Sequence, residues 1–348
     1  MTDSPIPIDW FDYDLPEELI AQHPVEPRDS ARMLVVDRAR QQISDHVFSD
    51  LPRFLQPGDL IVVNDTRVLR ARLFAQRDTG GRIEFLLLQR AADGTWTSLA
   101  RPARRLRIGE RLRLVAPDGQ LGNDVIEVVG RSAEEIVVRF DDEGAIERAG
   151  RVPLPPYIHE DVGDPERYQT VYARESGSAA APTAGMHFTP ELIQRCEASG
   201  IGMTSLTLHV GLGTFQPIKT QDVRDHPMHA EVYAVEPSTI QALRETRAAG
   251  GRIVAVGTTS VRTLESIADQ VLATDGTEPI AGSTRLYITP GYQFKLVDRM
   301  ITNFHLPRTT LLLLVASIIG EDLMRRAYEH AIRERYRFYS FGDAMLIV

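Results

Sequence analysis

Histidines occupy several turn-rich stretches of this chain and are its first candidates for acid/base chemistry. Six of the nine lie between residues 159 and 305. His187 ends a flexible turn before a predicted helix, and His209 ends a predicted strand before a two-glycine loop. Imidazole exchanges protons near neutral pH, and a helix N-terminus is expected to lower the pKa of His187. Both are therefore candidate catalytic residues, with a purely structural turn as the alternative.

A histidine and a carboxylate stand close together in residues 225–231 (DHPMHAE). Alternate residues of a strand face the same side, so His229 and Glu231 are predicted to form a hydrogen-bonded acid/base pair. His226, His229 and a carboxylate also resemble metal ligands, but Pro227 disfavours the helical spacing of the common zinc motif. We predict no metal site, and a solvated loop is the alternative.

Three further stretches have the composition of ligand-binding turns. Two glycines after a strand allow a ligand to approach the backbone closely, although an ordinary tight turn has the same composition. Residues 255–265 lead from a buried strand into hydroxyl residues at a helix N-terminus, which suits a carboxylate, phosphate or ribose. Simple helix capping is the alternative there and in residues 301–310. The predicted ligand-binding residues are Gly211, Gly213, Thr258, Thr259, Arg262 and His305.

Arginine supplies nearly all of the positive charge, because only Lys219 and Lys295 are lysines. A compact basic run, RPARRLR, occupies residues 101–107. Guanidinium groups bind phosphate in a bidentate manner, so the run suits a nucleic-acid backbone, while a solvated charged face is the alternative. The predicted phosphate-binding residues, which suit a nucleic-acid partner, are Arg67, Arg72, Arg101, Arg104 and Arg105.

Length and composition limit the class of protein that carries these residues. The chain has 348 residues, 43% of them hydrophobic and 25% charged, which is typical of a folded protein of about two domains. Its net charge of −9 does not exclude local basic patches. A single cysteine, Cys196, suits a reducing compartment, and the acidic N-terminus does not resemble a signal peptide. The longest apolar run, residues 311–319, is shorter than the roughly 20 residues of a membrane span. We therefore expect a cytoplasmic protein.

The pattern of elements changes along the chain and predicts two domains. Short alternating strands separated by turns fill residues 62–140 and predict a small antiparallel barrel or sandwich. After the stiff segment 152–157, strands alternate with helices, and Thr189 and Pro190 mark one helix start. Strands at 33–37 and 59–64 are expected to join the later sheet. The predicted fold is an α/β domain with a mixed sheet, residues 1–65 and 150–348, interrupted by an inserted antiparallel β-barrel, residues 66–149.

Ten stretches, in order along almost the whole chain, resemble the S-adenosylmethionine:tRNA ribosyltransferase-isomerase family of queuosine biosynthesis. The matching residues are 11–22 (FDYDLPEELIAQ), 63–67 (VNDTR), 152–158 (VPLPPYI), 168–173 (YQTVYA), 181–188 (APTAGMHF), 207–215 (TLHVGLGTF), 228–231 (MHAE), 255–260 (AVGTTS), 302–307 (TNFHLP) and 339–346 (YSFGDAML). Met186 and Thr309 depart mildly from the family pattern.

The resemblance implies a specific reaction. The family transfers and isomerises the ribosyl part of S-adenosylmethionine onto 7-aminomethyl-7-deazaguanine at the wobble position of tRNA, leaving epoxyqueuosine and releasing adenine and methionine. It also implies a monomer with an α/β domain and an inserted β-barrel, with tRNA and S-adenosylmethionine as partners. S-adenosylmethionine is then a consumed substrate, and no resident cofactor is expected.

That reaction needs at least two titratable groups, because a ribose methylene beside the sulfonium must lose a proton and the departing adenine gains one. We hypothesise that His187, His209, His229 and Glu231 share these roles. Two other functions remain open from the sequence. An S-adenosylmethionine-dependent RNA methyltransferase would use the same partners, but no early strand precedes a glycine-rich loop of the usual cofactor type. A noncatalytic RNA-binding protein would explain the arginines but not the histidines.

Overall fold

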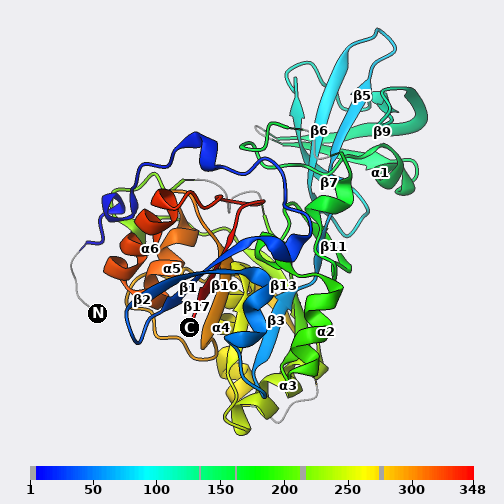
Figure 1. Cartoon of the computed structure of the whole chain (residues 1–348). Helices are drawn as coiled ribbons and strands as arrows, with labels where there is room; N and C mark the ends of the chain where they lie inside the picture. Colours follow the sequence, from blue (N-terminus) through cyan, green and yellow to red (C-terminus); the bar gives the residue numbers. More distant parts are fainter. Residues whose placement is uncertain (1–4, 133–134, 161–162, 212–216, 274–277) are drawn as a thin grey trace. The chain divides into compact units, whose positions relative to one another are not determined.

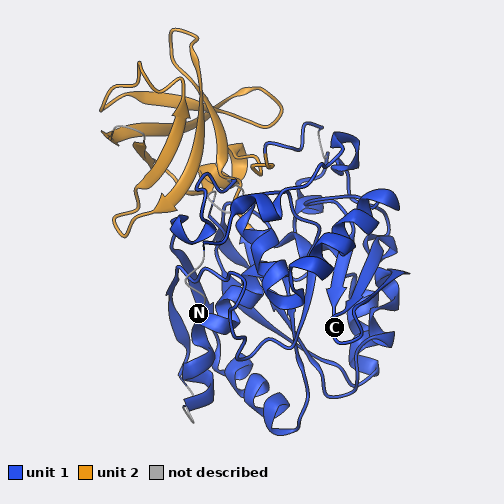
Figure 2. Cartoon of the chain, turned by 90° about the vertical axis from the view of Figure 1, so that its left-hand side faces the viewer, with its two compact units in different colours: residues 1–67, 156–348 blue, residues 68–155 orange. Residues whose placement is uncertain are grey.

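The computed structural model describes residues 5–132, 135–160, 163–211, 217–273 and 278–348. The chain divides into two compact units (Figure 2), which we call the body, Met1–Arg67 with Pro156–Val348, and the barrel unit, Val68–Pro155. The chain thus leaves the body once and returns to it. The predicted boundaries lay at 65/66 and 149/150.

The body is built on a nine-stranded mixed sheet, as the sequence predicted (Figure 1). Its order is β15-β13-β12-β3-β14-β16-β17-β1-β2, and the four neighbours β12, β3, β14 and β16 are parallel to one another. The N-terminal strands join it, and β17 pairs with both β1 and β16. The strands are β1 (Arg32–Asp37), β2 (Gln42–Val47), β3 (Leu60–Asn64), β12 (Gly202–Leu208), β13 (Glu231–Val235), β14 (Ile253–Val256), β15 (Ile280–Thr284), β16 (Arg299–Asn303) and β17 (Ala344–Ile347).

Both faces of the sheet are buried at its central strands, such as β3, β14, β16 and β17, which explains their continuous apolar sequences. The strands β2, β13 and β15 have exposed residues. Along β3, Leu60 and Val62 enter one core with the helices α3 to α6, whereas Ile61 and Val63 enter a second core with α2. The helices are α2 (Pro190–Ala198), α3 (Pro237–Ala248), α4 (Gly257–Ala273), α5 (Thr310–Ile319) and α6 (Glu321–Arg333). No helix in the described part of the chain is long and apolar enough to cross a membrane.

The barrel unit is a closed antiparallel barrel of six strands in the order β10-β7-β6-β5-β8-β9. The sequence pattern predicted all of these strands except β9, because Gly122, Asn123 and Asp124 at its start resemble a turn. The elements are β5 (Arg72–Gln76), β6 (Arg82–Arg90), β7 (Trp96–Arg101), β8 (Arg111–Val115), β9 (Leu121–Arg131), β10 (Ile136–Phe140) and the helix α1 (Gly144–Ala149). A two-stranded sheet pairs β4 (Thr66–Val68) with β11 (Glu175–Ser178).

The two predicted helix starts had different outcomes. At α2 the prediction is confirmed, because Thr189 Oγ1 accepts the Leu192 N–H at 3.1 Å and Pro190 is the first helical residue. The helix α4 begins at Gly257, directly after β14 and before the hydroxyl residues that were expected to stand at its N-terminus. Gly257 has φ +84°, which allows a sharp turn from β14 directly into the helix. Thr258 and Thr259 therefore lie inside α4, and capping from in front of the helix was the wrong interpretation.

Candidate active site

The candidate residues of the body gather where its parallel strands end. β12 leads to His209 and Gly211, β3 to Asp65, β14 to Thr258, and β16 ends at Asn303. These four strands are parallel neighbours, so their carboxyl ends share one edge of the sheet. β13 runs antiparallel to β12 and starts with Glu231, so this carboxylate reaches the same edge. Ligands of open α/β sheets bind at such an edge.

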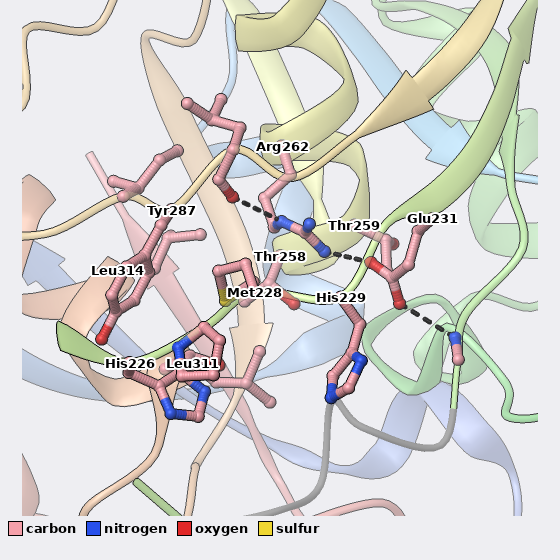
Figure 3. A pocket seen from close by; sticks show the side chains of 15 residues that line it. His226, Met228, His229, Glu231, Thr258, Thr259, Arg262, Tyr287, Leu311 and Leu314 are labelled. Atoms are coloured by element: carbon pink, nitrogen blue, oxygen red, sulfur yellow. Dashed lines mark hydrogen bonds and ion pairs between the residues drawn. The ribbon is translucent and has the colours of Figure 1, made fainter. Parts of the chain in front are cut away.

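A first chamber lies between this edge, the segment before β13, and the helices α4 and α5 (Figure 3). Six of the predicted site residues line it together: Gly211, His229, Glu231, Thr258, Thr259 and Arg262. Apolar side chains complete the wall, among them Met228, Ile288, Leu311 and Leu314. The chamber combines charged groups with a largely apolar lining, as small-molecule sites do.

A buried ion pair between Glu231 and Arg262 forms the polar wall of the first chamber (Figure 3). Their side chains are only 4% and 7% exposed. Glu231 also accepts the Gly211 N–H at 2.9 Å, and Arg262 Nε donates to the Leu286 carbonyl at 3.0 Å. Both oxygens of the Glu231 carboxylate therefore already have partners. Glu231 is thus better suited to position Arg262 and the Gly211 backbone than to exchange protons with a substrate.

The same wall contains two polar atoms that lack a hydrogen-bond partner within the described residues. Within the described residues, Thr259 Oγ1 and Arg262 Nη2 are buried and make no hydrogen bond. Buried polar groups are nearly always paired in folded proteins, because an unpaired one costs about 1–3 kcal/mol. Their presence beside a chamber indicates a polar ligand that supplies the missing partners.

His229 lines the first chamber from the segment before β13, and its side chain is exposed. It precedes the strand rather than lying in it, so the predicted common strand face with Glu231 does not form. His226 lines the same chamber, and burial lowers its pKa. Among the described residues, no group of three His, Cys, Asp or Glu side chains is arranged to hold a metal ion.

His209 is half-buried and is held by the chain segment that follows β3. Its Nδ1 lies 2.8 Å from Thr66 Oγ1, which donates to the Glu175 carbonyl at 3.4 Å. That hydroxyl therefore accepts the His209 Nδ1–H, which leaves Nε2 with a free lone pair. Burial lowers the pKa of His209, so the ring is neutral near pH 7. Gly177 packs against the imidazole, where a Cβ atom would approach to 2.7 Å.

Beside this histidine, Asp65 is a buried carboxylate that the sequence analysis did not identify. Its oxygens accept from Ser205 Oγ at 2.9 Å, Thr207 Oγ1 at 2.7 Å and Arg174 Nη2 at 2.9 Å. Two polar residues, Asn64 and Asp65, follow directly on the apolar run of β3, and this pattern could have identified them. The network fixes the ends of β3 and β12 beside His209.

A second chamber adjoins the first and shares Thr258, Thr259 and Leu311 with it. Its other walls come from the segment around Tyr157, the turn before α2, the end of β16 and the segment before β17. They include Tyr157, Thr183, Asn303, His305 and Tyr339. His305 was predicted to bind a ligand, and it lies here with Nε2 2.8 Å from Thr302 Oγ1. Burial lowers the pKa of His305 to about 3, so the ring is neutral and acts only through hydrogen bonds.

His187 lies in neither chamber as the described residues define them. It ends the 3₁₀ turn Thr183–His187 and is buried against Phe48, with Nε2 3.2 Å from Asn303 Nδ2. Burial, not the predicted helix N-terminus, is the largest cause that lowers its pKa to about 3. His187 therefore stays neutral and does not join His229 and Glu231. Gly213, the remaining predicted residue of the body, lies outside the described residues.

The predicted RNA-binding arginines fall into two groups. Arg67 is paired with Glu166 in the body, and Arg72 lies 3.2 Å from Glu84 in the barrel unit. Arg101 ends β7, and Arg104 and Arg105 lie on the segment after it; all three are exposed and form no ion pair among the described residues.

We call residues 101–109 the basic loop. Buried Leu106 anchors it in the barrel core, and Arg77 and Arg131 donate to its carbonyls at 2.9 and 3.2 Å. Arg107, which the sequence analysis did not include among the RNA-binding residues, is exposed on the same loop. A fixed backbone with free guanidinium groups suits an extended phosphate backbone.

Comparison with known proteins shows matches along almost the whole chain. The model of a family described as queuosine biosynthesis protein matches residues 8–347. A relative from Symbiobacterium thermophilum, named S-adenosylmethionine:tRNA ribosyltransferase-isomerase, is 53% identical over 97% of this chain and 98% of its own. A relative of the same name from Thermotoga petrophila is 50% identical over the same shares. The crystal structure of S-adenosylmethionine tRNA ribosyltransferase from Thermotoga maritima matches with a TM-score of 0.56 and 38% identity, covering 97% of this chain and all of that one.

Proposed function

The chain belongs to the queuosine biosynthesis protein family, and from this premise we propose that it is a tRNA ribosyltransferase-isomerase. It transfers and isomerises the ribosyl part of S-adenosylmethionine onto 7-aminomethyl-7-deazaguanine at the wobble position of tRNA. The products are epoxyqueuosine-tRNA, adenine and methionine. The observation that carries the proposal is the pair of adjoining chambers at the sheet edge, with unpartnered polar atoms in the shared wall.

The first chamber suits the methionyl end of S-adenosylmethionine. Its buried arginine is held by Glu231 and the Leu286 carbonyl, and one guanidinium nitrogen remains without a partner. A substrate carboxylate supplies the acceptor that this nitrogen lacks. In this arrangement Arg262 binds the substrate and Glu231 positions Arg262.

His209 and His229 are the candidates for proton transfer. The sulfonium makes the neighbouring ribose methylene acidic, so a neutral imidazole near it can remove a proton. His209 has a lowered pKa and, with its proton on Nδ1, an unprotonated Nε2, and His229 lines the first chamber. If His209→Ala and His229→Ala both retain near-normal turnover in folded protein, these assignments are wrong.

The barrel unit supplies the candidate surface for the tRNA backbone. Within the described residues, Arg101, Arg104 and Arg105 of the basic loop are exposed and form no ion pair, and exposed Arg107 lies near Glu110. The target base must leave the anticodon stack, because the reaction takes place on its side arm. The monomeric state and the cytoplasmic location stay predictions.

Transfer of label from S-adenosylmethionine tests the proposed reaction directly. The protein is incubated with tRNA that carries 7-aminomethyl-7-deazaguanine, using S-adenosylmethionine labelled either in the ribose or in the methyl group. We expect ribose label in the tRNA and free adenine in solution. Methyl label in the tRNA would instead identify a methyltransferase. Transfer of neither label, with intact RNA binding, would identify a noncatalytic RNA-binding protein.

A further inference from the structure

Asn303 presents an oriented amide at the end of β16, in the wall of the second chamber. Its side chain is 96% buried, since the residue is only 4% exposed. The amide oxygen accepts from Thr183 Oγ1 at 3.1 Å, and the amide nitrogen donates to His187 Nε2, 3.2 Å away. An amide has two N–H donors and an oxygen with two lone pairs, so each end can make one more hydrogen bond.

The neighbours of Asn303 match the orientation of its amide. His187 is neutral, because burial lowers its pKa to about 3, and in the tautomer with its proton on Nδ1 the Nε2 lone pair accepts the amide N–H. The Thr183 hydroxyl donates to the opposite end. Together these contacts give the chamber one donor and one acceptor side by side, in a fixed order.

Aromatic groups give the second chamber a wall that suits a flat ring. Tyr157 and Tyr339 both line it, with ring centroids 3.9 Å apart in an edge-to-face arrangement. Tyr339 has φ +75°, a left-handed conformation that is uncommon for a tyrosine. Strained residues of this kind persist where the surrounding structure holds them, often at ligand sites.

An amide with adjacent donor and acceptor is complementary to adenine, whose N6 amino group donates beside the N7 acceptor. We propose that the second chamber binds the adenine of S-adenosylmethionine, with Asn303 as its specificity residue and His187 as a positioning residue that acts through Asn303. The inference rests on the proposed function. One substrate then spans both chambers across Thr258, Thr259 and Leu311, which line both.

Binding of S-adenosylmethionine and its 6-oxo analogue tests the proposal on the full chain without tRNA. The analogue, in which the N6 amino group is replaced by oxygen, presents two acceptors to Asn303. We expect the wild type to prefer S-adenosylmethionine by about tenfold or more, and Asn303→Ala to lose this preference. Thr239→Val is the matched control. It removes a buried hydroxyl that bonds to the Ser205 carbonyl at 2.7 Å, outside both chambers, and should keep the preference.

Variants of the neighbours test the positioning role. His187→Ala leaves the Asn303 amide free to rotate, so the preference for the amino form should fall. His187→Gln retains an acceptor for the amide and should restore much of the preference, which a merely structural role would not require. Thr183→Val should give a similar partial loss. If Asn303→Ala does not fold, the preference measured in the His187 and Thr183 variants tests the proposal instead.

Three results separate the possibilities. An unchanged preference in folded Asn303→Ala would overturn the inference. The inference would also be overturned if Asn303→Ala raised the KM for tRNA and left S-adenosylmethionine binding unchanged, because the chamber would then hold the 7-deazaguanine base. Failure of the wild type to bind S-adenosylmethionine at all would contradict the proposed function itself.

Discussion

The two units of this protein differ sharply in which charged residues they carry. All nine histidines belong to the body, and the barrel unit has none. The barrel unit has 15 arginines against 13 acidic residues, whereas the body has 24 basic against 35 acidic residues. The overall charge of −9 is therefore an average of an acidic body and a slightly basic barrel unit. The histidines and the surplus of arginine over acidic residues thus belong to separate parts of the chain.

The arginines of the two units that we compare differ in burial and in pairing. Arg262 in the body is buried, is paired with Glu231 and has one nitrogen left for a ligand. Arg104 and Arg105 in the barrel unit are exposed and fully available to a polyanion. A buried guanidinium binds one ligand group in a fixed geometry and so contributes selectivity. An exposed guanidinium attracts any nearby anion, and salt weakens this attraction. The following predictions test this difference.

Removal of the buried carboxylate should have the largest effect on stability. In Glu231→Ala the charge of Arg262 stays buried without compensation, so we expect a loss of about 3–5 kcal/mol in the free energy of unfolding. Urea unfolding measures it. Glu143→Ala is the control in the barrel unit, because Arg90 and Glu143 are about half exposed and such pairs contribute about 1 kcal/mol or less. Equal losses in the two variants would contradict the comparison.

Mild acid should destabilise the body through its buried histidines. His187 and His305 have pKa values near 3 in the folded chain against 6.5 ordinarily, so the unfolded chain binds protons that the folded chain does not. The contribution of these neutral histidines to the free energy of unfolding is therefore fully present above about pH 6.5 and is lost as the pH drops toward 3. The loss is about 2 kcal/mol per histidine between pH 7 and pH 5.

The two tryptophans allow this acid effect to be assigned to a unit. Trp10 belongs to the body and Trp96 to the barrel unit, so Trp10→Phe and Trp96→Phe each leave one fluorescent reporter. We expect the urea midpoint reported by Trp10 to fall between pH 7 and pH 5, and His305→Gln should reduce that fall. A fall in the urea midpoint reported by Trp96, with no fall in the midpoint reported by Trp10, would contradict the histidine explanation.

Loss of the free arginines should weaken RNA binding and change its salt dependence. The triple variant Arg104→Gln, Arg105→Gln and Arg107→Gln removes up to three phosphate contacts, and each contact contributes about 0.7–0.9 to the slope of log affinity against log salt. We expect the slope to fall by about 2 to 3 units and the affinity at low salt by at least tenfold. Titration of labelled tRNA at several salt concentrations measures both.

A matched triple variant distinguishes free arginines from the charge of the whole barrel. Arg90→Gln, Arg111→Gln and Arg148→Gln remove the same charge from the same unit, but these arginines are paired with Glu143, Asp141 and Asp124. We expect a much smaller change in slope. A slope that falls equally in both variants would mean that the net charge of the barrel, and not the basic loop, attracts the RNA.

Local patterns predicted most of the fold and part of the site. Alternation and turn residues identified five of six barrel strands, and Thr189 with Pro190 identified the start of α2. Strand order was not predictable, because it depends on pairing between distant segments. For the same reason the sequence could not reveal that Glu231 meets Arg262 or that Arg67 meets Glu166. The turn around His187 suggested an accessible base, but burial depends on the packing of the whole second core.

The smallest predicted effect concerns the hydroxyl that orients His209. Thr66→Val removes the acceptor of the Nδ1–H, so the imidazole loses its fixed tautomer, and turnover should fall by about three- to tenfold, the equivalent of one hydrogen bond. Thr66→Ser keeps the hydroxyl and should retain most of the activity. The pH profile adds a second readout: because burial lowers the pKa of His209 below its usual 6.5, activity that depends on the neutral ring should decline only below that pH. If valine and serine at position 66 are equally active, with unchanged pH profiles, His209 does not act through this contact, and the proton-transfer role passes to His229.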